Sequence, residues 1–338
     1  MRKAGILLFI NMFFLGILLI NQHAPRVERV MMPIDSDPVA HYPVILENFD
    51  SAANPIDVKI SHKPQRVVVD RTDNVETLLS FGLEDRIVYA SMRRGTVSFD
   101  DMVSVYGKRL TDLRGIYERD LDRESVIAQQ PDCILGWRST FSRTRLGSTN
   151  WWKDRGVVTY ISPTSNRVVH IGTIEDECQH ILDIGDIFDE REKAEAIVSE
   201  IRAEVRATEK KIKNQKKQKV AVIELSGRMI TNYEKGWLVG DIVTRLGGEM
   251  PIHSRSIGVE DLIFYNPDVV FMIYLQEKQR KDIDRFLRKS ELQSIAAFRN
   301  QRVYLIQLDY VYAAGVKTVE GIKTVRQGLY PNVFEGKL

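Results

Sequence analysis

Arginines and aromatic residues follow several predicted strands, where a parallel sheet presents its loops to a ligand. In open α/β sheets, ligands meet the loops at the carboxyl ends of the strands. Arginine offers planar sets of donors for carboxylates and phosphates, and tryptophan and tyrosine offer flat faces with a polar tip. Together they suit a large ligand that is flat or anionic. The candidate ligand-binding residues are Arg93, Arg94, Trp137, Arg138, Arg143, Arg228, Tyr233, Trp237 and Tyr310.

The familiar catalytic patterns are absent from the sequence. It has no Gly-x-Ser-x-Gly elbow, no Gly-x-Gly-x-x-Gly, no phosphate loop and no His-Glu-x-x-His. Its six histidines lack ligand spacing, and we interpret each as a surface or capping residue. A dedicated zinc site would need three or four converging ligands. The sequence therefore predicts no catalytic residue, no metal site and no resident cofactor.

One segment occurs twice and carries a glutamate at the same place in both copies. Residues 119–137 read RDLDRESVIAQQPDCILGW, and residues 255–273 read RSIGVEDLIFYNPDVVFMI. Aligned without a gap, Glu124 matches Glu260, and the Pro-Asp pairs also match. Each copy predicts a short helix, a turn and a buried strand. The repeat predicts two similar lobes, each presenting one glutamate.

Two interpretations of these glutamates are open. A carboxylate in the first turn of a helix is favoured by the helix dipole, by ~0.3–1 kcal/mol. That effect explains a single glutamate well. Two glutamates at matched places in a repeat suit a two-point electrostatic contact with a partner equally well.

Length and composition fit a globular protein of about two domains. The chain has 338 residues, of which 43% are hydrophobic and 28% charged. Its net charge of +2 is too small to indicate nucleic acid. The lysine-rich run 210–219 has no interleaved aromatic residues, and we interpret it as a solvated helix end. We expect a monomer that binds no nucleic acid.

The first residues have the layout of an export signal. Arg2 and Lys3 precede the apolar stretch 4–20, and no clear cleavage site follows. The stretch is near the lower limit for crossing a bilayer, so residues 1–24 are either a signal peptide or an uncleaved membrane anchor. No cysteine follows that would support a lipid anchor. Because the basic residues stay inside, we expect the rest in the periplasm or on the extracytoplasmic face of the cytoplasmic membrane.

The two cysteines, Cys133 and Cys178, have two possible states. Export would allow a disulfide between them. Cys133, however, lies in an apolar run predicted to be a strand, where a small buried thiol is typical. Both states stay open.

Strands and helices alternate along most of the chain. Residues 25–56 are interpreted as a linker and a β-hairpin, and the hairpin pattern itself spans 42–60. Alternation over 57–168 predicts a first α/β lobe. Strand signals are absent over most of 169–219, where apolar residues keep helical spacing. Strands resume over 220–338, which we interpret as the second lobe.

The predicted fold is therefore α/β, with two lobes that are joined by one long helix. Each lobe should have a central, mostly parallel sheet flanked by helices. Within the helical stretch, Gly185 is expected to interrupt a first helix. Asp189 and Glu192 are expected to form a capping box that begins a second one. A helical connection of this kind limits how far the lobes can hinge.

In the order of its motifs, the chain resembles the periplasmic substrate-binding proteins of ATP-driven (ABC) importers for iron-siderophores, haem and vitamin B12. The resemblance covers roughly residues 42–331. It rests on YPV at 42–44, PQRVVV at 64–69, ETLLSFGLEDRI at 76–87, the two Glu…Pro-Asp segments, GDIF at 185–188, LDY at 308–310 and TVEGI at 318–322. Their order carries the resemblance more than any single motif does.

The resemblance implies a binding protein and not an enzyme. Two lobes would hold a small metal chelate in the cleft between them, with little hinge motion, and deliver it to an inner-membrane permease with its ATPase. Glu124 and Glu260 would pair with arginines of the permease. Many relatives carry a lipid-anchoring cysteine after the signal, and this chain has none there.

The identity of the chelate is open at this stage. The arginines favour an anionic ferric siderophore, which we expect. Haem is an alternative, because Tyr233 or Tyr310 could ligate its iron. Cobalamin is another, through Trp137 and Trp237. A different class of protein, a membrane-anchored periplasmic sensor, would use the same cleft without delivering cargo.

Overall fold

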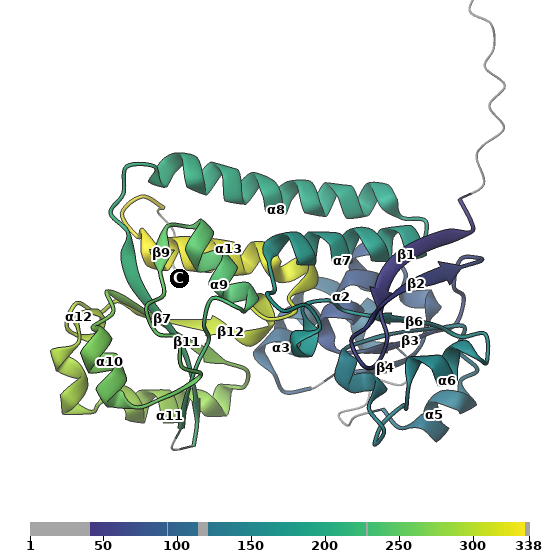
Figure 1. Ribbon diagram of the computed structural model, residues 1–338, viewed down its shortest axis with the longest axis horizontal. Coiled ribbons are helices and arrows are strands. Elements are labelled where there is room, and N and C mark those ends of the chain that lie inside the picture. Colours follow the sequence, from purple (N-terminus) through teal and green to yellow (C-terminus); the bar gives the residue numbers. More distant parts are fainter. Residues whose placement is uncertain (1–40, 93, 114–120, 228, 335–338) are drawn as a thin grey trace, which may run out of the picture. The chain divides into compact units, whose positions relative to one another are not determined.

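Two sheets, one in each half of the chain, organise the fold (Figure 1). The structure is a computed structural model that describes residues 41–92, 94–113, 121–227 and 229–334. The predictions for Arg93, Arg228 and the export segment lie outside these residues. The predicted α/β fold, with two helix-flanked sheets and a long helix between them, is confirmed.

The amino-terminal lobe contains a parallel sheet of four strands in the order β4-β3-β5-β6. The strands are β3 (Val67–Asp70), β4 (Ile87–Ser91), β5 (Cys133–Gly136) and β6 (Val158–Ile161). Their apolar residues are continuous and not alternating, as expected for a sheet covered on both faces. The order of the strands reverses between β3 and β5. Open parallel sheets bind ligands at such a switch point, beyond the carboxyl ends of the strands.

A hairpin and short helices surround this sheet. They are β1 (Val44–Phe49), β2 (Pro55–Ile60), α2 (Thr72–Phe81), α3 (Val97–Tyr106), α4 (Lys108–Thr111), α5 (Arg123–Ala128) and α6 (Thr149–Lys153). The predicted hairpin is confirmed as antiparallel. The Asn48 side chain joins it to β6, donating to the carbonyl of Ile161 at 3.0 Å and accepting from its N–H at 2.9 Å. The sequence did not predict α3, although Thr96 caps it by accepting from the N–H of Phe99.

Two helices occupy the stretch between the lobes, α7 (Ile174–Ile187) and α8 (Arg191–Ile212). The predicted long helix is α8. It packs on α7 and on the last helix, α13 (Thr318–Leu329) (Figure 1). Ala194, Ile201 and Val205 lie on its buried face, as their helical spacing predicts. Through these contacts α8 is tied to elements of both halves of the chain.

The prediction that Gly185 interrupts a helix is wrong. The residue lies inside α7, which continues to Ile187. A Cβ on Gly185 would come within 2.6 Å of the Ala194 Cβ on α8. The glycine therefore allows α7 and α8 to pack closely, and it does not end the helix.

The predicted capping box of Asp189 and Glu192 is also wrong. The residue before α8 is Glu190, which makes no side-chain cap hydrogen bond. Asp189 has a φ of 51°, outside the extended region that N-cap residues adopt. Its carboxylate lies 3.3 Å from Nδ1 of His41.

The carboxyl-terminal lobe contains a mixed sheet in the order β10-β8-β7-β11-β12, with β9 beside β7. Its strands are β7 (Gln218–Ser226), β8 (Met229–Asn232), β9 (Gly248–Glu249), β10 (Ser256–Ile257), β11 (Val269–Tyr274) and β12 (Val303–Gln307). The central strands β7, β11 and β12 are parallel, whereas β8 and β10 are antiparallel. Its other helices are α9 (Leu238–Arg245), α10 (Val259–Tyr265), α11 (Glu277–Leu287) and α12 (Ala296–Arg299).

Buried polar contacts tie the segment after β12 to the amino-terminal lobe. Glu177 of α7 accepts from the N–H of Gly315 at 2.8 Å, and burial raises its pKa. The Glu76 carboxylate on α2 lies 3.4 Å from Nζ of Lys317, and both side chains are nearly inaccessible. Moving the lobes apart would leave these groups unpaired in the interior, which is costly. The lobes are therefore held at a defined spacing.

Both cysteines are free and buried. Cys133 lies in β5 and Cys178 in α7. Burial raises the pKa of Cys178 to about 12, because a thiolate there would lose its hydration. Of the two states left open by the sequence, the structure has the buried thiols.

The structure leaves the mode of membrane attachment as a prediction. Within the described ranges, no helix combines the length and the apolar character needed to cross a membrane. The predicted signal or anchor, residues 1–24, lies outside those ranges.

The expectation that every histidine is a surface or capping residue is wrong for His180, which is buried inside α7. Only 1% of this residue is exposed, and its ring stacks on Tyr160 with centroids 5.6 Å apart. Nδ1 lies 3.3 Å from the Tyr160 hydroxyl, while Nε2 has no hydrogen-bond partner among the described residues. Burial lowers the pKa of His180 to about 4, because a charged ring would lose its hydration.

We predict that His180 makes the free energy of unfolding fall as the pH drops from about 6.5 to about 4. In this window the unfolded chain binds a proton that the folded chain does not, so acidification favours unfolding. Between pH 7 and pH 5 the loss should be ~2 kcal/mol. His180→Phe keeps a ring against Tyr160 but cannot titrate. Urea unfolding at both pH values should show a smaller loss for this variant, and equal losses would contradict the prediction.

Candidate functional site

Aromatic rings from both lobes meet in one cluster. Trp137 follows β5, and its ring centroid lies 5.3 Å from that of Tyr312, which follows β12. The ring centroid of Trp237 lies 5.5 Å from that of Tyr312 and 5.5 Å from that of Tyr233. We call these four residues the aromatic cluster. Tyr312 thus joins the tryptophan of one lobe to the tryptophan of the other.

Three guanidinium groups lie over the tryptophans of this cluster. Arg71 lies over Trp137, with its Cζ 5.0 Å from the ring centroid. Arg167 and Arg255 lie over Trp237, at 4.6 and 5.4 Å. Cations in these positions are attracted by the ring faces. The cluster therefore combines flat apolar faces with several positive charges, which suits a large anionic ligand.

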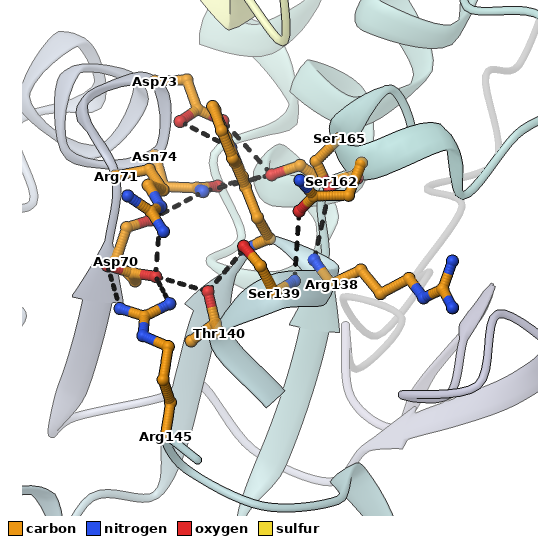
Figure 2. A network of polar contacts seen from close by, with 12 residues as sticks. Asp70, Arg71, Asp73, Asn74, Arg138, Ser139, Thr140, Arg145, Ser162 and Ser165 are labelled. Atoms are coloured by element: carbon orange, nitrogen blue, oxygen red, sulfur yellow. Dashed lines mark hydrogen bonds and ion pairs between the residues drawn. The ribbon is translucent and has the colours of Figure 1, made fainter. Parts of the chain in front are cut away.

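A buried carboxyl group fixes the indole of Trp137. Its Nε1 donates to both carboxyl oxygens of Asp73, at 3.0 and 3.1 Å. Ser162 donates to the same carboxyl at 3.2 Å (Figure 2). Burial raises the pKa of Asp73 well above its usual range, although the bond from Trp137 opposes the shift. These bonds hold Trp137 in one orientation.

A second buried carboxylate, Asp70 at the end of β3, gathers arginines beside the cluster. Arg145 donates to it at 3.0 and 3.3 Å, and Thr140 donates through its hydroxyl. The Nε of Arg71 lies 3.4 Å from it. Figure 2 shows Arg71 and Arg145 converging on Asp70 from two sides. One carboxylate therefore faces two guanidinium groups.

A small pocket lies on the carboxyl-terminal side of the cluster. Its volume is about 150 Å³, below the ~300–1,000 Å³ of typical ligand pockets, so it would hold one arm of a large ligand. Trp237 is 9% exposed, and its Nε1 has no hydrogen-bond partner in the described part of the chain. The pocket is lined by Thr231, Asn232, Tyr233, Trp237, Arg255, Leu308 and Tyr312.

The structure brings together three of the predicted ligand-binding residues, Trp137, Tyr233 and Trp237. The other predicted residues lie elsewhere or face away. Arg94 and Arg143 are exposed, and Arg138 extends away from Asp70 and Asp73 (Figure 2). Tyr310 donates its hydroxyl to Asp101 of α3 at 3.1 Å. Arg93 and Arg228 lie outside the described residues.

Sequence reasoning missed four residues of the site: Arg71, Arg167, Arg255 and Tyr312. The strand-end rule, applied to β3, would have found Arg71. Tyr312 lies two residues beyond Tyr310, past a short helix that redirects the chain. Arg167 ends a short 3-10 helix and Arg255 lies just before β10, and only long-range packing brings both to Trp237. No local signal in the sequence marks them.

The repeated segments fold alike, and their aspartates have a structural role. Asp132 accepts from the two backbone N–H groups just before β3, those of Gln65 and Arg66, at 2.7 and 2.9 Å. Asp268 accepts from the N–H of Lys219 in β7 at 2.9 Å. Each aspartate thus anchors the strand beside its own. This half of the repeat is scaffold.

The matched glutamates lie free at the surface. Glu124 is the second residue of α5 and Glu260 the second of α10. Both are exposed, and neither forms a hydrogen bond or ion pair within the described part of the chain. An isoleucine follows each by three residues, Ile127 at 45% and Ile263 at 41% exposure. The two lobes thus present the same acidic and apolar pair.

Other hollows in the described residues lack the chemistry of the cluster. One of about 680 Å³ lies at the amino ends of β3 and β4 and is lined by charged residues of both signs. One of about 590 Å³ lies beside Glu260. No group of three or more histidine, cysteine, aspartate or glutamate side chains converges on a metal position in the described ranges.

We predict that Trp137→Phe costs about 1–3 kcal/mol in the free energy of unfolding, because Asp73 loses a buried donor. Trp237→Phe is the matched control. This variant also replaces an indole of the aromatic cluster by a smaller phenyl ring, but the Nε1 that it removes has no hydrogen-bond partner among the described residues. Urea unfolding of both variants should show the larger loss for Trp137→Phe. Equal losses would contradict the structural role assigned to the Asp73 bond.

Comparison with known families and curated proteins supports the fold and the class. The profile of the periplasmic binding protein family matches residues 67–310, from β3 to the segment after β12. The uncharacterized ABC transporter substrate-binding lipoprotein YvrC of Bacillus subtilis is 22% identical over 293 residues, which cover 85% of this chain and 86% of that protein. The vitamin B12-binding protein of Vibrio parahaemolyticus is 22% identical over 289 residues, 83% of this chain and 92% of that protein.

Solved structures of similar fold cover most of the described residues. A periplasmic binding protein from Veillonella parvula superposes with a TM-score of 0.78 at 29% identity, over 86% of this chain and 92% of that one. A protein of the ABC-type Fe³⁺-hydroxamate transport system from Saccharomonospora viridis superposes with a TM-score of 0.68 at 19% identity, over 86% of this chain and 99% of that one. With its two lobes, its linking helix and the family match across most of its length, the chain belongs to the periplasmic binding protein family.

Proposed function

We propose that this chain is the extracytoplasmic receptor of an ABC importer, and that it binds a ferric chelate at the aromatic cluster. The observation that carries the proposal is the joining of Trp137, Tyr312 and Trp237 across the lobes, with arginines over both tryptophans. Family membership and the predicted export segment support the location outside the cytoplasmic membrane.

The rigidity of the interior supports a receptor that works without large closure. The contacts of Glu177 and Glu76 cross between segments of the two lobes, so the rings of the cluster stay at fixed distances. A preformed site of this kind binds without the cost of ordering its own side chains. Affinity would come from stacking on the tryptophans and from the arginines.

Cobalamin is the second candidate cargo. Its support is the similarity to a vitamin B12-binding protein and the two tryptophan faces, which suit a large flat ring system. The ferric chelate is favoured because three guanidinium groups lie at the tryptophan faces, where their positive charge would attract an anionic ligand more strongly than an uncharged one.

Delivery would depend on Glu124 and Glu260. The helix dipole explains why a glutamate is tolerated near each helix start, but it does not require that both glutamates be exposed at matched positions. Exposed carboxylates that have no internal partner are suited to pairing with basic residues of a permease. Pairs of this kind steer association and fix orientation more than they supply affinity.

We predict that the purified protein binds a ferric siderophore with a dissociation constant of about 1 μM or tighter. Binding should quench tryptophan fluorescence, because two of the four tryptophans lie in the site. Ferric citrate, a ferric trihydroxamate, haemin and cyanocobalamin would be compared, with equilibrium dialysis as confirmation. The double variant Trp137→Phe/Trp237→Phe should lose most of the quenching. Binding of none of the four would contradict the proposal.

We predict that Glu124→Lys/Glu260→Lys leaves cargo affinity unchanged and abolishes uptake into cells, because both contacts with the permease become repulsive. The control Glu209→Lys/Glu249→Lys makes the same change in net charge on exposed glutamates outside α5 and α10. Uptake of radiolabelled iron chelate measures the effect. Normal transport by the first variant would show that these glutamates do not dock the receptor.

A further inference from the structure

The carboxyl-terminal lobe exposes a phenyl ring on the same helix as Glu260. Phe264 of α10 is 80% exposed, and its ring meets that of the neighbouring Tyr265 edge-on, with centroids 5.1 Å apart. Phe264 belongs to none of the hydrophobic clusters that the described residues form. An aromatic ring that stays in water contributes little to folding, because folding is driven by the apolar area that it buries.

The exposed apolar side chains of this lobe gather at one place. The described part of the lobe exposes three large ones, Met229, Ile263 and Phe264. Ile263 and Phe264 follow Glu260 by three and four positions, so these three side chains lie along one face of α10. Met229 and Glu260 both line the hollow of about 590 Å³ beside that helix. Single exposed apolar residues are ordinary, but apolar surface gathered beside a charged residue is typical of an interaction site.

The matched helix of the amino-terminal lobe presents a smaller version of this face. In the ungapped alignment of the repeated segments, Ile127 corresponds to Ile263 and Ala128 to Phe264. Ala128 is also exposed. At the three matched positions α5 therefore presents glutamate, isoleucine and alanine, and α10 presents glutamate, isoleucine and phenylalanine. The two faces share a charge and an isoleucine and differ by one aromatic ring.

This difference breaks the approximate symmetry of the receptor. Two equal acidic contacts would allow a two-lobed receptor to bind a partner in either of two orientations. An aromatic side chain that fills a fitted recess commonly supplies a large share of the binding energy of an interface. A ring on one lobe only would therefore favour one orientation, provided that the partner has a recess on one side only.

A second copy of this chain is a poor partner for the face. Two copies that met symmetrically through α10 would bring their Glu260 carboxylates together, and like charges repel. A partner with a basic residue beside an apolar recess fits both features of the face. The permease proposed to pair with Glu260 has that chemistry at this place.

We propose that Phe264 is an apolar anchor that enters a recess of the permease beside the basic residue that pairs with Glu260, and that the permease has no such recess opposite Ala128. The inference rests on the proposed function and adds to it the orientation in which the receptor docks. The carboxyl-terminal lobe would supply most of the docking energy, and the amino-terminal lobe would supply mainly charge.

Uptake measurements on single variants test the anchor. Cells that produce each variant in place of the wild type would be given ferric citrate or a ferric trihydroxamate, both radiolabelled with iron. Phe264→Ala should lower the rate of uptake at least about 10-fold with unchanged cargo affinity, because the anchor is lost. Phe264→Leu keeps an apolar side chain and should retain most of the uptake. The control Ile45→Ala removes a side chain of the hairpin that is 63% exposed, and uptake should not change.

A swap between the lobes tests the orientation. The double variant Ala128→Phe/Phe264→Ala moves the ring to the matched position of α5. Because the recess lies on one side only, this variant should transport as slowly as Phe264→Ala. Wild-type uptake by the swapped variant would show that either lobe can supply the ring, and the claim of a single orientation would be wrong.

Two further measurements distinguish the anchor from other uses of the ring. The melting temperature of Phe264→Ala should stay within about 2 °C of the wild type, as for other surface substitutions. A fall of more than about 5 °C would assign the ring to the fold and overturn the inference. A wild-type dimer in light scattering that Phe264→Ala converts to a monomer would assign the ring to a second copy, which also overturns it.

The glutamate variants separate this inference from the proposed function. Wild-type uptake by Phe264→Ala, where Glu124→Lys/Glu260→Lys abolishes uptake, would overturn the anchor alone. Normal uptake by the double glutamate variant would overturn the proposed docking, and the anchor falls with it. A wild-type protein that supports uptake of neither chelate would contradict both.

Discussion

The buried polar contacts across the lobes are the constraint on which the rest of the structure depends. Glu177 and Glu76 lie in the interior, where a carboxylate without a partner is costly. Their partners, Gly315 and Lys317, belong to the segment that follows β12. That segment also carries Tyr312, the ring that joins the two tryptophans. Satisfying two buried acids therefore also positions the centre of the aromatic cluster.

The parts of the fold that depend on local pattern could be predicted from the sequence. The hairpin, the alternation of strands and helices and the long helix α8 follow from apolar periodicity, which burial on one or two faces imposes. The prediction for Gly185 was wrong because a glycine can either end a helix or allow another helix to pack closely against it. Only the contact with Ala194, which is distant in the sequence pattern, distinguishes the two cases. The prediction for His180 was wrong for a similar reason, since the burial of this residue depends on Tyr160 and the helices around it.

The candidate site shows the same division. Trp137 and Trp237 follow predicted elements and could be selected by residue type and position. Arg167 and Arg255 could not be selected, because they come from segments far apart in the sequence that the fold brings to one ring. The arginines that the sequence analysis selected, such as Arg143, are of the same residue type, but they lie on the exposed surface. Residue type identifies the chemistry of this site well, and tertiary packing decides which residues supply it.

The link between Asn48 and Ile161 bears on how the molecule behaves among its own copies. β6 is the last strand of its sheet, and an edge strand offers unpaired N–H and C=O groups to any other chain. At Ile161 both groups are already bound by one side-chain amide. A single asparagine thus takes the place of a neighbouring strand at that point. This shields part of the sheet edge from pairing with a second molecule and so lowers the tendency of the protein to aggregate through that strand.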